Sequence, residues 1–141
     1  MARDPLLVLS RLRSITLDAA RRALADRLGE QEAAAARAAD VAATQVREAD
    51  AQARLPELAT APDAYAAWLT RIHAQRDAAQ TAVKTATEST TAARVTVNEE
   101  RAAARALEAV LTQAQERRRR EAARQEQRAL DEAAGSRRRR P

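Results

Sequence analysis

The chain has 141 residues, but alanine supplies 39 of them, phenylalanine is absent, and tryptophan and tyrosine occur once each. So few large apolar side chains exclude a compact core at native packing density, whereas Ala, Arg, Leu, Gln and Glu all favour helix. The formal net charge is +5 and there is no cysteine, which excludes a disulfide framework and a thiolate metal site.

No apolar stretch approaches the roughly 20 residues that a membrane-spanning helix needs. The apolar run at residues 6–9 is too short for the core of a signal peptide, and Arg11 and Arg13 follow it at once. We therefore expect a cytosolic protein without a transmembrane segment.

A first helix is expected over about residues 5–54. Asp4 is a suitable capping carboxylate, and Pro5 is favoured at a first helical position because its missing N–H is not needed there. A row of residues spaced by seven and four predicts the seam that faces a partner helix. The expected seam positions are Leu17, Leu24, Leu28, Gln31, Ala35, Ala38, Ala42, Gln45, Ala49 and Gln52. A second apolar row, of Val8, Leu12 and Ile15, lies on another face and has no evident partner in a hairpin.

A turn is expected over about residues 55–62, because Pro56 and Pro62 cannot both lie inside one helix. Thr60 and Asp63 resemble a capping box that starts the next helix. Such a short connection predicts that the second helix folds back antiparallel to the first.

The second helix, over about residues 63–134, has the more regular heptad pattern. Its expected seam positions are Leu69, Ile72, Arg76, Ala79, Val83, Ala86, Thr90, Ala93, Val97, Glu100, Ala104, Leu107, Leu111 and Ala114. Most are apolar over seven heptads, which is typical of a coiled coil. We interpret Arg76, Thr90 and Glu100 as local interruptions that could set the register.

The fold class is thus all-α: a single antiparallel two-helix coiled-coil hairpin over residues 1–141. The second helix should outrun the first by about 20 residues, leaving about residues 115–134 unpaired. Gly135 and Ser136 should stop the helix, with a disordered Arg-rich tail at 135–141.

Catalysis has no support in the sequence. The lone His73 cannot form a transition-metal site without further ligands; it is expected on the surface. No Ser or Thr has an activating His–acid pair, and there is no Gly-rich phosphate loop. We expect no enzyme activity, no metal, no cofactor and no small-molecule ligand.

Tyr65, Trp68 and Ile72 lie three and four residues apart at the start of the second helix. They could close the hairpin as a hydrophobic plug, or they could anchor a partner protein, because Trp and Tyr concentrate binding energy at interfaces.

The excess positive charge lies entirely in residues 113–141, with 10 Arg against 5 acids. It could belong to a solvated helix end, or bind an acidic protein surface or a nucleic acid. The interleaved acids, together with the absence of aromatic residues for base stacking, favour a protein partner over a nucleic acid.

The chain resembles the flagellar FliJ family, the small coiled-coil proteins of the flagellar type III export apparatus. The resemblance rests on residues 5–13, on Tyr65, Trp68 and Leu69, and on the Glu-Gln-x-x-Leu-Asp-Glu motif within residues 126–134. It implies a hairpin similar to the central stalk of a rotary ATPase, which inserts into the hexameric export ATPase and contacts the export gate at the cytoplasmic face of the inner membrane. It also implies export chaperones as further partners.

The resemblance also implies which residues contact each partner. Trp68 and Ile72 would contact the export gate, and Tyr65, which shares their helix face, is added to them. On the basis of the resemblance, the ATPase-facing residues would be Arg11, Arg13, Arg124, Gln127, Arg128, Leu130 and Asp131. The charge argument adds the consecutive arginines Arg117, Arg118, Arg119 and Arg120 to this set. This chain has few bulky residues on its first helix, so a contribution of that helix to gate binding is not implied. A nucleic-acid-binding coiled coil and a peripheral stalk, or stator, of a related ATPase stay open as alternatives.

Overall fold

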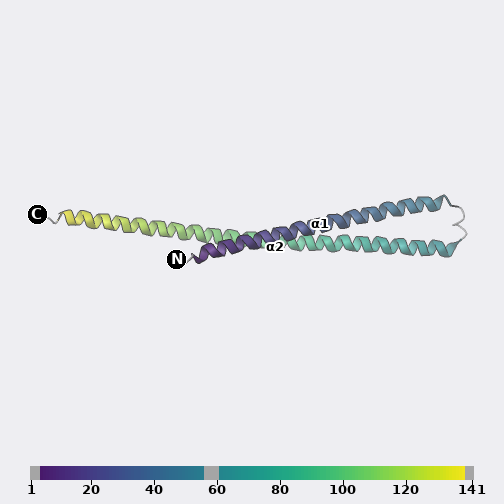
Figure 1. Cartoon of the computed structure of the whole chain (residues 1–141), viewed down its shortest axis with the longest axis horizontal. Helices are drawn as coiled ribbons and strands as arrows, with labels where there is room; N and C mark the ends of the chain where they lie inside the picture. The colour runs from purple at the N-terminus through teal and green to yellow at the C-terminus, as the bar shows by residue number, and fades with distance from the viewer. Residues whose placement is uncertain (1–3, 56–60, 139–141) are drawn as a thin grey trace. The chain divides into compact units, whose positions relative to one another are not determined.

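The computed structural model describes residues 4–55 and 61–138, and these residues form two long α-helices and no strand. Helix α1 spans Pro5–Ala53 and helix α2 spans Pro62–Arg138 (Figure 1). They pack against each other as an antiparallel hairpin, which confirms the predicted all-α fold. The expected cap at Thr60 and the last residues of the predicted tail, 139–141, lie outside the described residues.

The start of α1 follows the predicted capping geometry. The Asp4 carboxylate accepts a hydrogen bond from the backbone N–H of Leu6 at 3.1 Å, and the Asp4 carbonyl accepts from the N–H groups of Leu7 and Val8. These bonds satisfy N–H groups of the first turn that have no partner within the helix.

The α1–α2 connection lies where the prolines predicted it. The last turn of α1 closes with a bond from the N–H of Leu55 to the carbonyl of Gln52 at 3.1 Å, the tighter spacing common at helix ends. Helix α2 then begins at Pro62, one residue before the expected start, with Asp63 in its first turn, where a negative charge is favoured by the helix dipole.

The predicted helix stop at Gly135 and Ser136 is wrong, because α2 continues through both residues to Arg138. A glycine stops a helix when it takes up the left-handed conformation, and no described glycine has a positive φ. Gly135 is instead an internal helix position, with no atom within 4 Å of an added Cβ.

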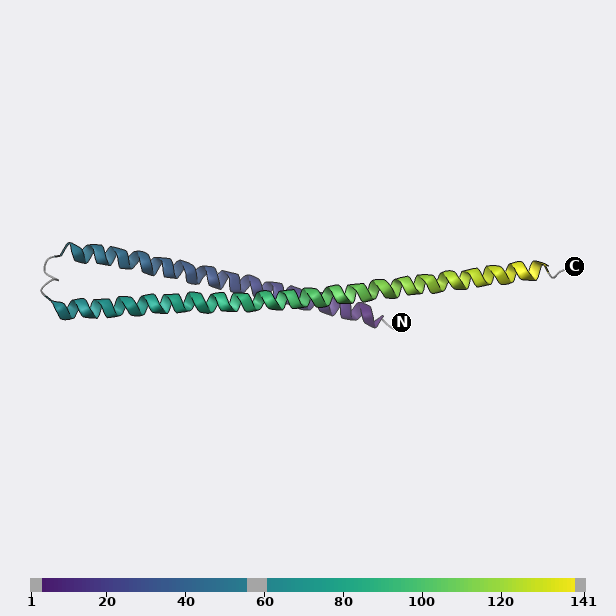
Figure 2. The same ribbon diagram turned by 180° about the vertical axis from the view of Figure 1, so that it is seen from behind.

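The chain divides into two compact units, each built from parts of both helices. The middle unit is Asp18–Asn98, and the terminal unit combines Met1–Leu17 with Glu99–Pro141. In the middle unit the second part of α1 and the first part of α2 run side by side, as both views show (Figures 1 and 2).

The seam of α2 was predicted almost completely. Every expected position is buried or half-buried except Arg76, which is exposed. Ile72, Thr90 and Val97 are the most deeply buried of them. The regular heptads of Val, Leu and Ile therefore identify the face that packs on α1.

The prediction of the seam of α1 was half right. One expected row, at Leu17, Leu24, Gln31, Ala38, Gln45 and Gln52, is covered by α2. The other expected row, at Leu28, Ala35, Ala42 and Ala49, is exposed, and its place is taken by Ala20, Ala34, Val41 and Glu48. The second row is thus displaced by one residue over most of its length.

Few side chains are deeply buried. Among the described residues these are Ala34, Ile72, Val97 and Thr90, and the accessible surface is 11570 Å². A compact protein of 15.4 kDa would expose about 7,200 Å². Most of the described side chains are therefore open to contact, and the candidate functional sites are exposed surfaces.

Candidate interaction surfaces

Tyr65 and Trp68 form a stacked aromatic pair on the first turns of α2. Their ring centroids are 5.6 Å apart with an interplanar angle of 30°. Tyr65 is 48% exposed, whereas Trp68 is half-buried against α1 and donates its indole N–H to Glu48 Oε2 at 3.0 Å. Arg71 donates to the same oxygen at 3.2 Å. Trp68 thus helps to fasten the two helices, and Tyr65 is the more accessible ring.

Ile72 is not on this surface, contrary to the prediction that grouped it with the aromatic pair. Its side chain is only 9% exposed, and its carbonyl accepts a hydrogen bond from Gln45 Nε2 at 3.0 Å. Ile72 occupies a seam position facing α1, so a partner cannot reach it without separating the helices. The predicted gate-contact residues therefore combine one exposed ring with two groups that hold the hairpin together.

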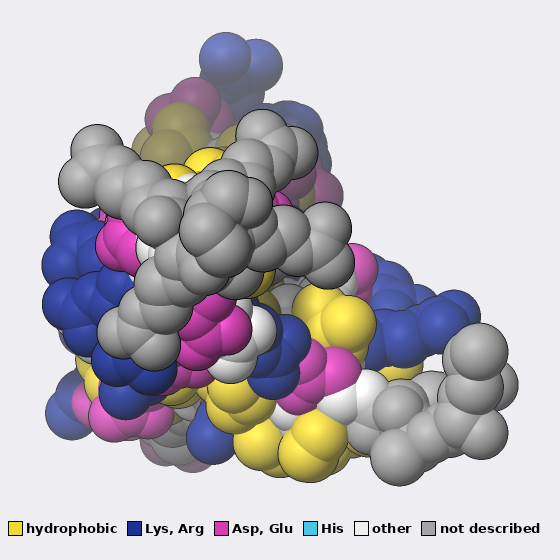
Figure 3. Space-filling model, turned by 90° about the vertical axis from the view of Figure 1, so that its left-hand side faces the viewer, with side chains coloured by type: hydrophobic (Ala, Val, Ile, Leu, Met, Phe, Trp, Pro, Cys, Tyr) yellow, Lys and Arg dark blue, Asp and Glu magenta, His cyan; other side chains and the backbone are white. Residues whose placement is uncertain are grey.

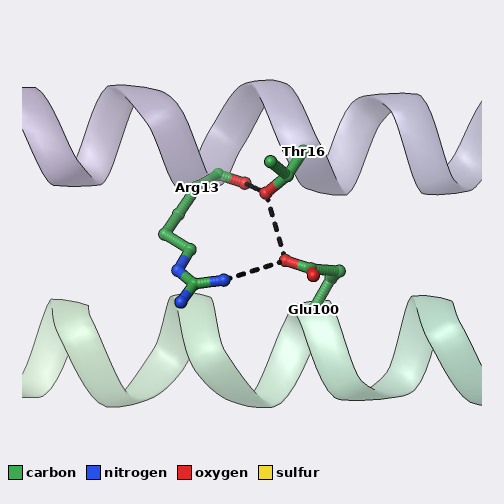
Figure 4. A network of polar contacts seen from close by, with 3 residues as sticks. All are labelled: Arg13, Thr16 and Glu100. Carbon is green, nitrogen blue, oxygen red and sulfur yellow. Dashed lines mark hydrogen bonds and ion pairs between the residues drawn. The ribbon is translucent and has the colours of Figure 1, made fainter.

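Glu100 interrupts the seam in the terminal unit, and the interruption is compensated by α1. Glu100 Oε2 accepts from Thr16 Oγ1 at 3.1 Å and from Arg13 Nη1 at 3.4 Å (Figure 4). Thr16 Oγ1 also lies 2.9 Å from the Arg13 carbonyl. Arg13, predicted to face the ATPase, is therefore engaged in an ion pair between the helices, although its side chain is still 47% exposed.

The start of α1 is joined to the four consecutive arginines of α2 at residues 117–120, called here the Arg cluster. Arg118 Nη1 donates to Asp4 Oδ2 at 3.1 Å, so the residue that caps α1 also binds the cluster. Arg120 pairs with Glu116 within α2, at 3.8 Å. Arg117 and Arg119 are both exposed, and neither forms an ion pair with another residue that the structure describes.

Beyond the Arg cluster, α2 continues past the first residue of α1. All described side chains from Gln115 to Gly135 are exposed, which agrees with the predicted overhang. Arg124, Arg128 and Leu130 lie on this segment, Leu130 with 66% of its surface exposed. Gln127 donates to Asp131 at 3.0 Å, one turn away. Acidic and basic side chains are interleaved where this end of the molecule faces the viewer (Figure 3).

The second apolar row of α1 is exposed, as its position off the seam predicted. Val8, Leu12 and Ile15 are 51%, 55% and 55% exposed, and their neighbours Leu7 and Leu9 are 58% and 47% exposed. Arg11 lies among them and is also exposed. No role was predicted for these apolar side chains, although their 4-then-3 spacing was visible in the sequence.

The sequence did not reveal the cross-helix partners. Three residues of the first helix or its cap bind residues of α2: Glu48, Asp4 and Thr16. Such pairs depend on the register of the two helices, which the sequence pattern does not give. His73 is exposed, as expected. Within residues 4–55 and 61–138 no cluster of acidic or His side chains fits a metal ion, and neither helix has a stretch long and apolar enough to cross a membrane.

No family model, curated protein or solved structure matches this chain.

Proposed function

We propose that the chain is a non-enzymatic component of flagellar protein export, which binds the hexameric export ATPase as a central stalk and links it to the export gate at the membrane. Export chaperones are its further partners. The observation that carries this proposal is the antiparallel hairpin whose longer helix extends, fully exposed and Arg-rich, beyond the start of the shorter one.

The physical properties of the two helices support a stalk. The seam of α1 contains Ala20, Ala34 and Ala38, and small side chains allow two helices to pack closely. The Arg cluster and the following segment offer both signs of charge on an unpaired helix, which suits a protein lumen of complementary charge. Acids interleaved at this density would weaken binding to phosphate groups.

The ATPase contact is tested by replacing Arg117, Arg118, Arg119 and Arg120 with Gln and measuring stimulation of the export ATPase. We expect stimulation to fall about tenfold or more, because four charges are lost from one surface. The matched control replaces Arg47, Arg76, Lys84 and Arg94, four exposed cations of the middle unit, with Gln. An ATPase rate at low salt that is equal for all three proteins would contradict the proposal.

The gate contact is tested at Tyr65, the accessible ring of the aromatic pair. Tyr65→Ala should weaken binding to the export-gate protein by about tenfold, in the range for loss of an aromatic anchor. Val46→Ala, which alters a side chain that is 61% exposed elsewhere in the same unit, should leave affinity unchanged. Equal affinities for the two variants would remove Tyr65 from the contact.

The Arg cluster also motivates nucleic-acid binding as a second candidate function. In that case the chain would shift random DNA in a gel, and the affinity would fall steeply with salt. A stator role predicts a dimer, which light scattering distinguishes from the monomer expected of an intramolecular hairpin.

A further inference from the structure

The second apolar row of α1 has a position that the export role does not explain. With about 100° of rotation per residue, Val8, Leu12 and Ile15 fall within a narrow sector of α1. The covered positions Leu6, Ser10 and Leu17 lie about 150° around the helix from that sector. The stripe formed by Val8, Leu12 and Ile15, called here the apolar stripe, therefore faces away from α2.

The terminal unit, which contains the apolar stripe, carries a net positive charge. Arg11 is exposed within it, and the hydrogen bond between Arg118 and Asp4 holds the Arg cluster beside the start of α1. The terminal unit carries 15 basic against 9 acidic residues, a net charge of +6, whereas the middle unit carries 10 against 11, a net charge of −1. Figure 3 shows hydrophobic side chains together with Lys and Arg side chains on the face seen from this direction.

The exposed apolar side chains and the positive net charge together indicate which kind of partner binds the apolar stripe. A second copy of the chain would bring a net charge of +6 against another of +6, so self-association through this surface is disfavoured. The stripe extends over residues 8–15, about 12 Å of helix, and a contact of that length falls well short of the roughly 800 Å² per partner in a stable protein interface. A protein would need most of its contact elsewhere.

An anionic lipid bilayer is compatible with both the positive charge and the short apolar stripe. It accepts a short apolar helix face at any point of its surface without shape complementarity, and its headgroups attract nearby arginines. We propose that the terminal unit binds the surface of an anionic bilayer, with the apolar stripe inserted at the headgroup level, Arg11 on the lipid phosphates, and the Arg cluster of α2 attracted to the bilayer over a longer range. This binding does not depend on the export role and needs no membrane-spanning segment.

The test is sedimentation of the full chain with phosphatidylcholine vesicles prepared with and without phosphatidylglycerol. We expect the chain to bind the anionic vesicles, to bind the neutral ones at least about tenfold more weakly, and to be released by high salt. Leu12→Gln with Ile15→Gln should reduce binding to anionic vesicles about tenfold or more, because the inserted apolar area is lost.

The matched control is Val46→Gln with Val95→Gln, which changes two valines of the middle unit that are 61% and 51% exposed. It should bind as the unchanged chain does, and circular dichroism should give all three proteins the same helix content. Equal loss in both double variants, or equal binding to neutral and anionic vesicles, would overturn the proposal. The proposal would also be overturned if the chain bound no vesicles but formed a stoichiometric complex with an acidic amphipathic peptide, and if that complex required Leu12 and Ile15.

Discussion

Thr90 is the most deeply buried polar side chain described, with 1% of its surface exposed. Its hydroxyl lies 3.1 Å from the Arg27 carbonyl across the seam and 2.9 Å from the Ala86 carbonyl of its own helix. Thr90→Ala should lower the free energy of unfolding by about 1–2 kcal/mol, because a buried methyl group and the cross-helix bond are both lost. Urea unfolding followed by circular dichroism measures the change.

Thr96 provides the control for that substitution. It bonds to Ala92 one turn back on the same helix, as Thr90 bonds to Ala86, but it is exposed. Thr96→Ala should leave stability unchanged or raise it by up to about 0.5 kcal/mol, since Ala is the better helix former. A similar loss for both variants would show that the seam contact of Thr90 contributes nothing.

Glu48 receives two donors from α2, the indole of Trp68 and the guanidinium of Arg71. Glu48→Ala should destabilise the middle unit by about 1–2 kcal/mol, because a half-buried indole N–H loses its acceptor. It should also shift the emission of Trp68, the chain's one tryptophan, to longer wavelength. Asp50→Ala, an exposed acid two residues away, should change neither the emission nor the urea midpoint.

At the level of the helices, the contrast between side chains explains what the sequence could predict. The seam of α2 was recognisable because Val83, Val97 and Leu107 differ sharply from their polar neighbours. In α1 adjacent residues such as Ala34 and Ala35 have the same or similar size, so the periodicity of apolar residues could not distinguish the row that α2 covers from the row beside it. Glu48 lies in the covered row because its carboxylate has partners across the seam, and no pattern of apolar residues reveals that.

Gly29 lies in the interior of α1 with no positive φ and no atom within 4 Å of an added Cβ. Gly29→Ala should therefore stabilise the chain by about 0.5–1 kcal/mol through the lower entropy of the unfolded state. The change should appear as a higher urea midpoint. A loss of stability would mean that this position needs the conformational freedom of glycine.

Glu100 places a polar contact in the seam of the terminal unit, with 26% of its side chain exposed. Glu100→Leu should raise the melting temperature by a few degrees, because an apolar side chain replaces a partly buried charge at a seam position and Arg13, with 47% of its side chain exposed, stays hydrated without its partner. It should also weaken the specification of register, which light scattering would detect as association between chains. Glu99→Leu, on the adjacent exposed position, should not raise the melting temperature.

For the whole molecule, we expect the paired and the unpaired segments of α2 to contribute unequally to stability. Deleting residues 121–141 removes described side chains that are all exposed, so the melting temperature should stay within about 3 °C of the full chain. The helical signal should fall with the number of residues removed. A large drop in melting temperature would show that this segment folds back on the rest of the chain.

The hydrogen bond between Asp4 and Arg118 lies where the paired part of α2 ends, and we expect the backbone hydrogen bonds of α2 to be shorter-lived beyond it. An isolated helix of about 20 residues opens and closes on a microsecond scale, and its amides open without separating α1 from α2. Amide hydrogen exchange should therefore be fast after Arg118 and slow around Thr90 and Val97. Trypsin should cut first at Arg124 and Arg128, so that limited digestion releases the charged end of α2 and leaves the paired helices intact.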